Sequence, residues 1–288
     1  MTSFRHDLID FSKNVYSAGG EDGLLEEMLN RIENKNLLEK KCLEVGASDG
    51  VLHSNTRNLV LNRDFFGIYI ESSIKQFHSL KSNFSDSSKV YLINQEIGHS
   101  GSNTLDNLIY ADHSLDVLSI DIDGMDWYIF ESLSLLRPKI ICIEYNPTIP
   151  NEVSYIQPEN YKTFIGNSAK ALIELGKTKQ YACMAITEKN LIFVDDFFLS
   201  DLYPAKEIEL QQANPSGNNP LVIFFGYDGT VLSNTNVLNT RWHGKFFIED
   251  LQIMPAFLRS YPISNNLIKK ICYKVFLYYK AIKRKYYR

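Results

Sequence analysis

The sequence of 288 residues contains no apolar run long enough to cross a bilayer, since none approaches the ~18 apolar residues that a spanning helix needs. No apolar stretch follows the initial Met, so we expect no signal peptide. Cysteine is scarce, and three of the four cysteines lie in apolar runs far apart from one another. This distribution predicts buried free thiols rather than disulfides or a zinc site. We therefore expect a protein of the reducing cytoplasm.

Acidic residues are missing from the last part of the chain. No Asp or Glu follows Asp250, although the formal net charge of the whole chain is only −4. Lysine and arginine accumulate in residues 266–288, interleaved with aliphatic and aromatic side chains. A basic helix of this kind is typical of an element on an anionic membrane surface, so the protein could lie on the inner face of the membrane. A solvated tail is a second interpretation. Nucleic acid, which Lys, Arg and Tyr can also hold, is a less favoured third.

The dinucleotide-binding motif G-x-G-x-x-G is also absent. The chain has instead CLEVGASDG at residues 42–50, an apolar run that ends in a loop with glycine at both ends. Two such glycines often mark a turn that binds nothing, but after a buried parallel strand they also permit close backbone approach to a ligand. Carboxylates beside the loop favour a ligand with a cationic amino group and ribose hydroxyls, as S-adenosylmethionine has. The candidate cofactor residues here are Glu44, Gly46, Ala47, Asp49 and Gly50, with Asn55 at the start of the next helix.

Apolar runs alternate with helical patterns through the first two thirds of the chain. Strands are predicted at residues 41–45, 65–70, 90–94, 115–120 and 139–143, and a final hairpin at 181–186 and 191–194. This order predicts an α/β fold with a Rossmann-like, mostly parallel sheet that has one antiparallel strand, which is the plan of class I methyltransferases.

A C-terminal appendage is expected to follow the sheet. We predict a methyltransferase domain at residues 1–200, an appended β-rich or irregular segment at 201–260, and the basic amphipathic helix at 261–288.

Polar residues stand where the second and third predicted strands end. Glu71 ends the second strand, 21 positions after Gly50, which is close to the ~20 residues that separate a glycine loop from a ribose-binding acid. The alternative for Glu71 is an ordinary helix-cap carboxylate. Asn94 and Gln95 follow the third strand and are candidates to face an adenine ring.

Acids also gather after the fourth and fifth predicted strands. Asp121 and Asp123 follow an apolar strand, and Glu144 and Asn146 flank the end of the next. Clustered buried carboxylates repel one another unless they share a cation or a proton, which points to function. Two routes are open for removing a proton from a substrate: a side-chain base among Asp121, Asp123 and Glu144, or Mg²⁺ held by Asp121, Glu144 and Asn146.

The sequence resembles the FkbM-type S-adenosylmethionine-dependent methyltransferases over roughly residues 18–200. The stretches that carry this resemblance are Cys42–Gly50, Ser54–Asn58, Thr104–Leu108 and Leu118–Asp126. Three more stretches resemble a bacterial branch encoded among surface-polysaccharide genes: Gly20–Leu25, Ile141–Pro150 and Gln157–Ser168.

The resemblance implies methyl transfer to oxygen. It implies that Glu44, Gly46 and Asp49 surround the methionine part of the cofactor, that Glu71 takes the ribose, and that Asp121 lies below the sulfonium. Ser119 departs from the family pattern, which has Lys at this position, so no catalytic lysine is carried over.

We therefore expect an O-methyltransferase that uses S-adenosylmethionine, with Mg²⁺ as a second candidate cofactor. The expected acceptor is a sugar hydroxyl of a surface glycan or its lipid-linked precursor, that is, a carbohydrate or glycolipid. The alternative is a non-catalytic glycan- or nucleotide-binding module that keeps the fold. An NAD-dependent enzyme is disfavoured by the missing glycine motif and by the strand order.

Overall fold

The computed structural model describes residues 8–35, 38–109, 114–159, 164–208, 210, 221–240, 244–261 and 266–286. The chain divides into two compact units, Met1–Asn219 and Pro220–Arg288. We call them unit 1 and unit 2 and describe each by itself. The division into three segments that the sequence suggested stays a prediction.

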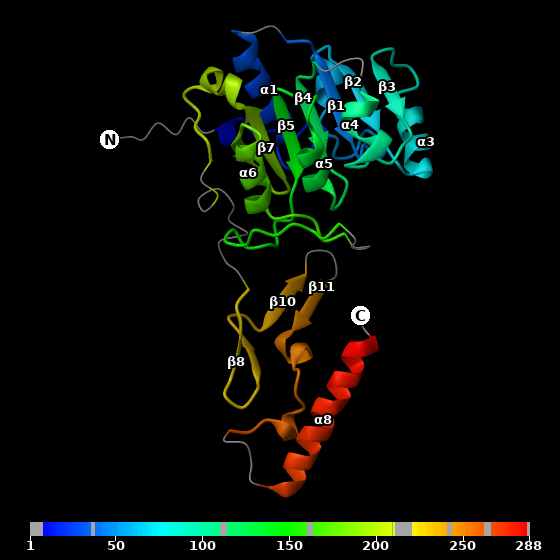
Figure 1. Ribbon diagram of the computed structural model, residues 1–288. Coiled ribbons are helices and arrows are strands. Elements are labelled where there is room, and N and C mark those ends of the chain that lie inside the picture. The colour runs from blue at the N-terminus through cyan, green and yellow to red at the C-terminus, as the bar shows by residue number, and fades with distance from the viewer. Residues whose placement is uncertain are drawn as a thin grey trace, which may run out of the picture. The chain divides into compact units, whose positions relative to one another are not determined.

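Unit 1 is built on a seven-stranded sheet with the order β3-β2-β1-β4-β5-β7-β6 (Figure 1). The strands are β1 (Lys41–Val45), β2 (Phe66–Ile70), β3 (Val90–Ile93), β4 (Val117–Ile120), β5 (Ile140–Glu144), β6 (Tyr181–Ile186) and β7 (Asn190–Asp195). The first five strands pair in parallel, and β7 is antiparallel to both β5 and β6. The predicted α/β sheet with one antiparallel strand is therefore confirmed.

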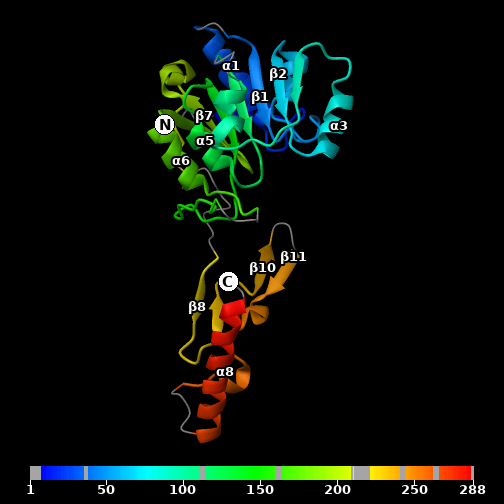
Figure 2. The same ribbon diagram turned by 45° about the vertical axis from the view of Figure 1, so that its right-hand side comes forward.

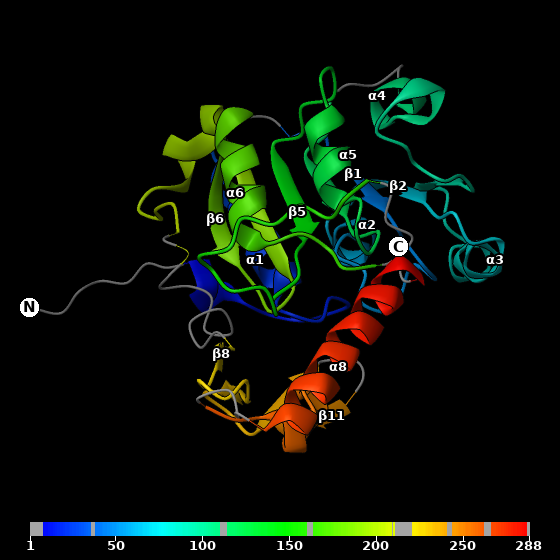
Figure 3. The same ribbon diagram turned by 60° about the horizontal axis from the view of Figure 1, so that its bottom comes forward.

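Helices cover both faces of this sheet. They are α1 (Glu21–Glu33), α2 (Arg57–Asn62), α3 (Ile74–Asn83), α4 (Leu105–Leu108), α5 (Asp126–Ser132) and α6 (Ala169–Thr178). Short 3₁₀ helices are η1 (Leu8–Phe11), η2 (Gly101–Asn103) and η3 (Asp196–Leu202). One apolar cluster joins α1, α2 and α3 to one face of the sheet, and a second joins α4, α5 and α6 to the other. Figure 3 shows α5 and α6 side by side over the second face.

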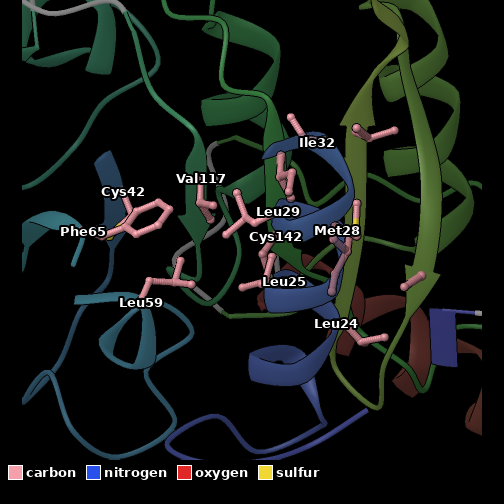
Figure 4. Packing of buried hydrophobic residues seen from close by; sticks show 14 of the residues in the cluster. Leu24, Leu25, Met28, Leu29, Ile32, Cys42, Leu59, Phe65, Val117 and Cys142 are labelled. Carbon is pink, nitrogen blue, oxygen red and sulfur yellow. The ribbon is translucent and has the colours of Figure 1, made fainter. Parts of the chain in front are cut away.

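Helix α1 anchors the first of these clusters. Its apolar residues recur at helical spacing, and all of them are fully buried against strand residues such as Cys42, Val117 and Cys142 (Figure 4). They are Leu24, Leu25, Met28, Leu29 and Ile32. Burial of each side chain stabilises the fold by about 1.5–3 kcal/mol relative to full exposure, as an upper estimate. Packing, rather than helix propensity, therefore holds α1 on the sheet.

Helix α5 is shorter than its apolar pattern predicts. Apolar residues continue along the sequence to Leu136, but α5 ends at Ser132. The carboxylate of Asp106 accepts hydrogen bonds from the backbone N–H groups of Ser134, Leu135 and Leu136 at 2.8–3.0 Å. These amides therefore have a partner outside the helix, and the segment leaves the helical path.

Unit 2 contains two separate hairpins and a long terminal helix (Figure 2). Its elements are β8 (Ile223–Phe225), β9 (Val231–Ser233), β10 (Val237–Thr240), β11 (Gly244–Phe247), η5 (Ile248–Leu251), η6 (Ala256–Leu258) and α8 (Leu267–Tyr286). The basic tail is thus helical as predicted, with residues 287–288 outside the described part of the chain. Within the described residues, no helix combines the length and the apolar character that crossing a membrane requires.

Candidate active site

The glycine loop after β1 is fixed by contacts to two neighbouring strands. Gly46 has a φ of +80°, and the N–H groups of Gly46 and Ala47 both donate to the carbonyl of Ile70 at 3.0 Å. A Cβ added at Gly46 would lie 1.7 Å from the carbonyl oxygen of Asp121. No other residue fits here, because the backbone takes a left-handed conformation and the end of β4 is in direct contact. The loop and Asp121 are therefore adjacent.

Glu71 joins this loop to the start of α3. Its side chain is buried, one carboxylate oxygen accepts from the Ser48 N–H at 2.7 Å, and the other accepts from the Ser73 N–H at 2.6 Å. Both expectations for Glu71 fit this geometry. It caps the chain before α3, and each oxygen keeps a further lone pair for a ribose hydroxyl.

The side chain of Glu44 is buried, and its partners are groups of the protein itself. Its carboxylate accepts from the hydroxyl groups of Ser54 and Thr56 at 2.8 and 2.5 Å, and from the N–H groups of Asn55 and Thr56 at 3.3 and 3.1 Å. Burial raises the pKa of Glu44, and these hydrogen bonds oppose the rise. Glu44 therefore holds the segment before α2, and its predicted contact with the methionine part stays a prediction.

The other loop residues have mostly structural partners. One oxygen of Asp49 accepts from the N–H groups of Val51 and Leu52 at 2.9 Å each. A Cβ on Gly50 would lie 2.4 Å from a methyl group of Leu80, so this glycine permits close packing of α3. The Asn55 side chain donates to the hydroxyl of Ser119 at 3.0 Å. Ser119, which accepts this bond, stands at the position where the FkbM-type pattern has Lys.

Asn94 and Gln95 lie at the end of β3, beside Glu71. The amide of Asn94 donates to the carbonyl of Glu71 at 2.7 Å and to that of Ser72 at 3.2 Å, and its side chain is exposed. Gln95 is half-buried. The two residues therefore stand at the edge next to the ribose candidate, and their contact with adenine stays a prediction.

The structure brings three of the predicted acids together beyond β4 and β5. Carboxylate oxygens of Asp121, Asp123 and Glu144 all lie within 4.8 Å of one another. Burial, and then the neighbouring charge of Asp121, raise the pKa of Glu144 to about 10. Glu144 therefore keeps its proton near neutral pH and shares it with Asp121, whose pKa burial also raises. This arrangement provides both a proton acceptor and a set of hard oxygen ligands.

A fourth acid, Asp126, shapes the loop that carries Asp121 and Asp123. It is buried, and its two oxygens accept from the N–H groups of Ile122 and Gly124 at 2.9 and 2.8 Å. Burial raises the pKa of Asp126 to about 7, with a further contribution from Asp121. Asp123 has a φ of +59°, so the loop is held in a strained conformation that presents its exposed carboxylate.

Asn146, a predicted metal ligand, makes hydrogen bonds within the loop that follows β5. Its side-chain oxygen accepts from the N–H and the hydroxyl of Thr148 at 2.9 and 2.6 Å, and its amide donates to the carbonyl of Ile165 at 2.7 Å. The amide thus stabilises a loop. Its predicted role as a metal ligand stays a prediction.

Sequence reasoning missed Asn190 at the start of β7. Asn190 stands opposite Glu144 in the β5–β7 ladder, and its amide donates to the carboxylate of Glu21 at 2.9 Å. Its side-chain oxygen is buried and has no hydrogen-bond partner among the described residues. Glu21 also accepts from the hydroxyl of Thr187 at 2.6 Å. These contacts join residues 166 and 169 positions apart, and no local pattern signals them.

No protein-family model matches the chain, and no curated protein matches it. The FkbM-type resemblance therefore stays a prediction.

Solved structures of methyltransferases are similar in fold. A putative caffeoyl-CoA O-methyltransferase from Staphylococcus aureus shares 16% identity at a TM-score of 0.40, over 59% of this chain and 82% of that one. An S-adenosylmethionine-dependent methyltransferase from Clostridium acetobutylicum shares 14% identity at a TM-score of 0.37, over 59% and 89%. The CMeT domain of the citrinin polyketide synthase shares 10% at a TM-score of 0.42, over 62% of this chain. The chain spans 54% of that domain.

Proposed function

We propose that this protein is an S-adenosylmethionine-dependent methyltransferase that transfers a methyl group to a hydroxyl oxygen. One observation carries the proposal. The contact of Gly46 with the carbonyl of Asp121 brings the predicted cofactor loop against the acidic trio, at the carboxyl edge of the parallel strands. In open α/β sheets this edge is where ligands bind.

The residues of this edge suit the cofactor. Glu71 has lone pairs for the ribose hydroxyls, and the loop at Gly46–Gly50 offers backbone at close range. The carboxylates of Asp121 and Asp123 favour a positively charged sulfonium over an anionic phosphate. Bound S-adenosylmethionine would supply an activated methyl group at this edge.

The acidic trio would remove the proton of the acceptor hydroxyl. When oxygen attacks the methyl carbon, the carbon–sulfur bond breaks, and the hydroxyl proton passes to the carboxylate of Asp121 or Asp123, while protonated Glu144 donates a hydrogen bond to Asp121. The three carboxylates also fit a divalent cation, because they offer oxygen ligands at short mutual distance. Mg²⁺ would there neutralise the developing alkoxide. Asp121 and Glu144 serve in either route.

The experiment measures transfer of labelled methyl from S-adenosylmethionine to a panel of methyl glycosides. We expect product with the unmodified protein and a loss of at least about 100-fold with Asp121→Asn, as for removal of a general base. The matched control is Glu174→Gln, an exposed acid on α6. Full activity after dialysis against EDTA would exclude the Mg²⁺ route, and full activity of Asp121→Asn would exclude the assigned role of the trio.

We further propose that the acceptor is a sugar hydroxyl at the end of a lipid-linked glycan and that α8 rests on an anionic membrane surface. The basic side chains of α8 include Lys269, Lys270, Lys274, Lys280 and Lys283. Each basic residue near such a surface contributes about 1 kcal/mol of attraction. Removing residues 266–288 should release the protein from vesicles that contain anionic lipid. Unchanged sedimentation of the truncated protein with those vesicles would refute this assignment.

A further inference from the structure

Unit 2 has an apolar groove between η6 and α8. The cavity has a volume of about 450 Å³, and its lining includes Phe257, Leu258, Cys272, Val275, Phe276 and Tyr279. Phe257, Val275 and Tyr279 remain 61%, 63% and 55% exposed. Contiguous exposed apolar surface of this kind marks a binding site more often than isolated exposed residues do.

The chemistry of the lining selects the occupant. The Cys272 thiol and the Tyr279 hydroxyl are the polar side-chain groups among the lining residues, so a polar ligand would lose its hydrogen bonds to water without replacement. The volume lies within the range of small-ligand sites, which is about 300–1,000 Å³. A hydrocarbon chain fits both properties.

The charge around the groove selects what the hydrocarbon chain is attached to. The ammonium group of Lys280 lies 5.6 Å from the centroid of the Phe276 ring, which lines the groove, so a positive charge stands at its edge. The sequence of α8 itself contains no acidic residue. An anionic head group next to an apolar chain therefore complements this surface, whereas a neutral lipid satisfies only the groove.

We propose that this groove binds the hydrocarbon chain of a lipid phosphate, namely the carrier of the methyl acceptor. This inference rests on the proposed function, because it identifies the acceptor as a lipid-linked molecule. Unit 2 then selects the acceptor by its anchor, while unit 1 carries out the chemistry.

Cys272 provides a direct test in the full-length protein. Of the four cysteines, Cys42, Cys142 and Cys183 are buried, and Cys272 is the partly accessible one, in the wall of the groove. A maleimide should therefore label this thiol first. Dodecyl phosphate, used as a monomer below its micelle concentration, should slow the labelling at least about tenfold. Inorganic phosphate and dodecanol at the same concentration should protect less, because each satisfies only one half of the site.

Two variants separate groove binding from non-specific adsorption. Val275→Trp fills the groove and should weaken dodecyl phosphate binding at least about tenfold in a calorimetric titration. Leu277→Trp adds the same side chain to α8 at an exposed position outside the groove lining, and it should leave binding within about twofold. Lys280→Glu should weaken binding at least about fivefold, the equivalent of the roughly 1 kcal/mol per basic residue at an anionic surface.

The results that overturn the inference are equally specific. Labelling that dodecyl phosphate slows no more than inorganic phosphate does would overturn it, as would equal effects of the two Trp variants. Protection that rises with protein concentration in the absence of lipid would show that a second copy covers the groove. Binding of S-adenosylhomocysteine is measured on the same samples. If dodecyl phosphate protects Cys272 but S-adenosylhomocysteine does not bind, the proposed function alone is refuted. If S-adenosylhomocysteine binds but dodecyl phosphate does not protect Cys272, the proposed groove alone is refuted.

Discussion

Replacement of Gly46 by alanine tests the contact on which the proposed site depends. The new Cβ would lie 1.7 Å from the carbonyl oxygen of Asp121, whereas real Cβ atoms essentially never lie closer than 3.0 Å to a non-bonded heavy atom. The ends of β1 and β4 must therefore separate by at least about 1.3 Å, the difference between these distances. A shift of this size displaces the cofactor loop from the acidic trio.

Gly101 provides a matched control. Its φ of +78° is nearly that of Gly46, but a Cβ there meets nothing within 4 Å. Alanine at either position costs about 1–2 kcal/mol for the left-handed backbone, which lowers the melting temperature of a unit of this size by roughly 2–8 °C. Gly101→Ala should show this cost alone. Gly46→Ala should melt at a lower temperature still.

Titration with S-adenosylhomocysteine completes the comparison. We expect Gly46→Ala to bind at least about tenfold more weakly than the unmodified protein, a loss of about 1.4 kcal/mol, and Gly101→Ala to bind within about twofold. If Gly46→Ala melted like Gly101→Ala and bound the ligand with unchanged affinity, the close contact of the loop with Asp121 would not matter for binding, and our reasoning would be wrong.

Two further predictions concern buried acids. The pKa of Glu144 is raised to about 10 in the folded protein, so the protonated side chain stabilises the fold. This stabilisation is fully present below the ordinary pKa of glutamate and is lost as pH rises toward the pKa in the folded protein. The melting temperature should therefore fall between about pH 6 and about pH 9, and Glu144→Gln, which has no proton to lose, should reduce this fall; an unchanged slope would contradict the raised pKa. Glu44→Ala leaves the donors of Ser54 and Thr56 without their acceptor and should destabilise unit 1 by about 2–4 kcal/mol in urea unfolding. Exposed Glu174→Ala should change stability by less than about 0.5 kcal/mol, and equal effects of the two variants would refute the structural role of Glu44.

The sheet was predictable because its signals are local. Each buried strand is a short apolar run, and β1 is followed by Gly46, whose left-handed backbone only glycine adopts without strain. The strand ends gave the positions of Glu71 and Asp121, since parallel strands align their carboxyl ends at one edge. In the structure β2 and β4 both pair in parallel with β1, which brings these residues to the same edge of the sheet.

The partners of the site side chains were not predictable in the same way. The contact of Asn190 with Glu21 joins residues 169 positions apart, and the preference of Asn146 for Thr148 depends on the local loop conformation. Early termination of α5 depends on Asp106, which lies 28–30 positions before the amides that it binds. Such contacts form only when the chain packs into its tertiary structure, so the periodicity of the sequence does not predict them.

The most direct test of the account is a calorimetric titration of the purified protein with S-adenosylhomocysteine, beside Glu71→Ala and with NAD as a control ligand. The account predicts binding in roughly the micromolar range, equivalent to about −8 kcal/mol, loss of binding in Glu71→Ala, and no binding of NAD. If the unmodified protein bound no S-adenosylhomocysteine, with or without Mg²⁺, the proposal of a methyltransferase would be contradicted. The chain would then be a binding module that keeps the fold.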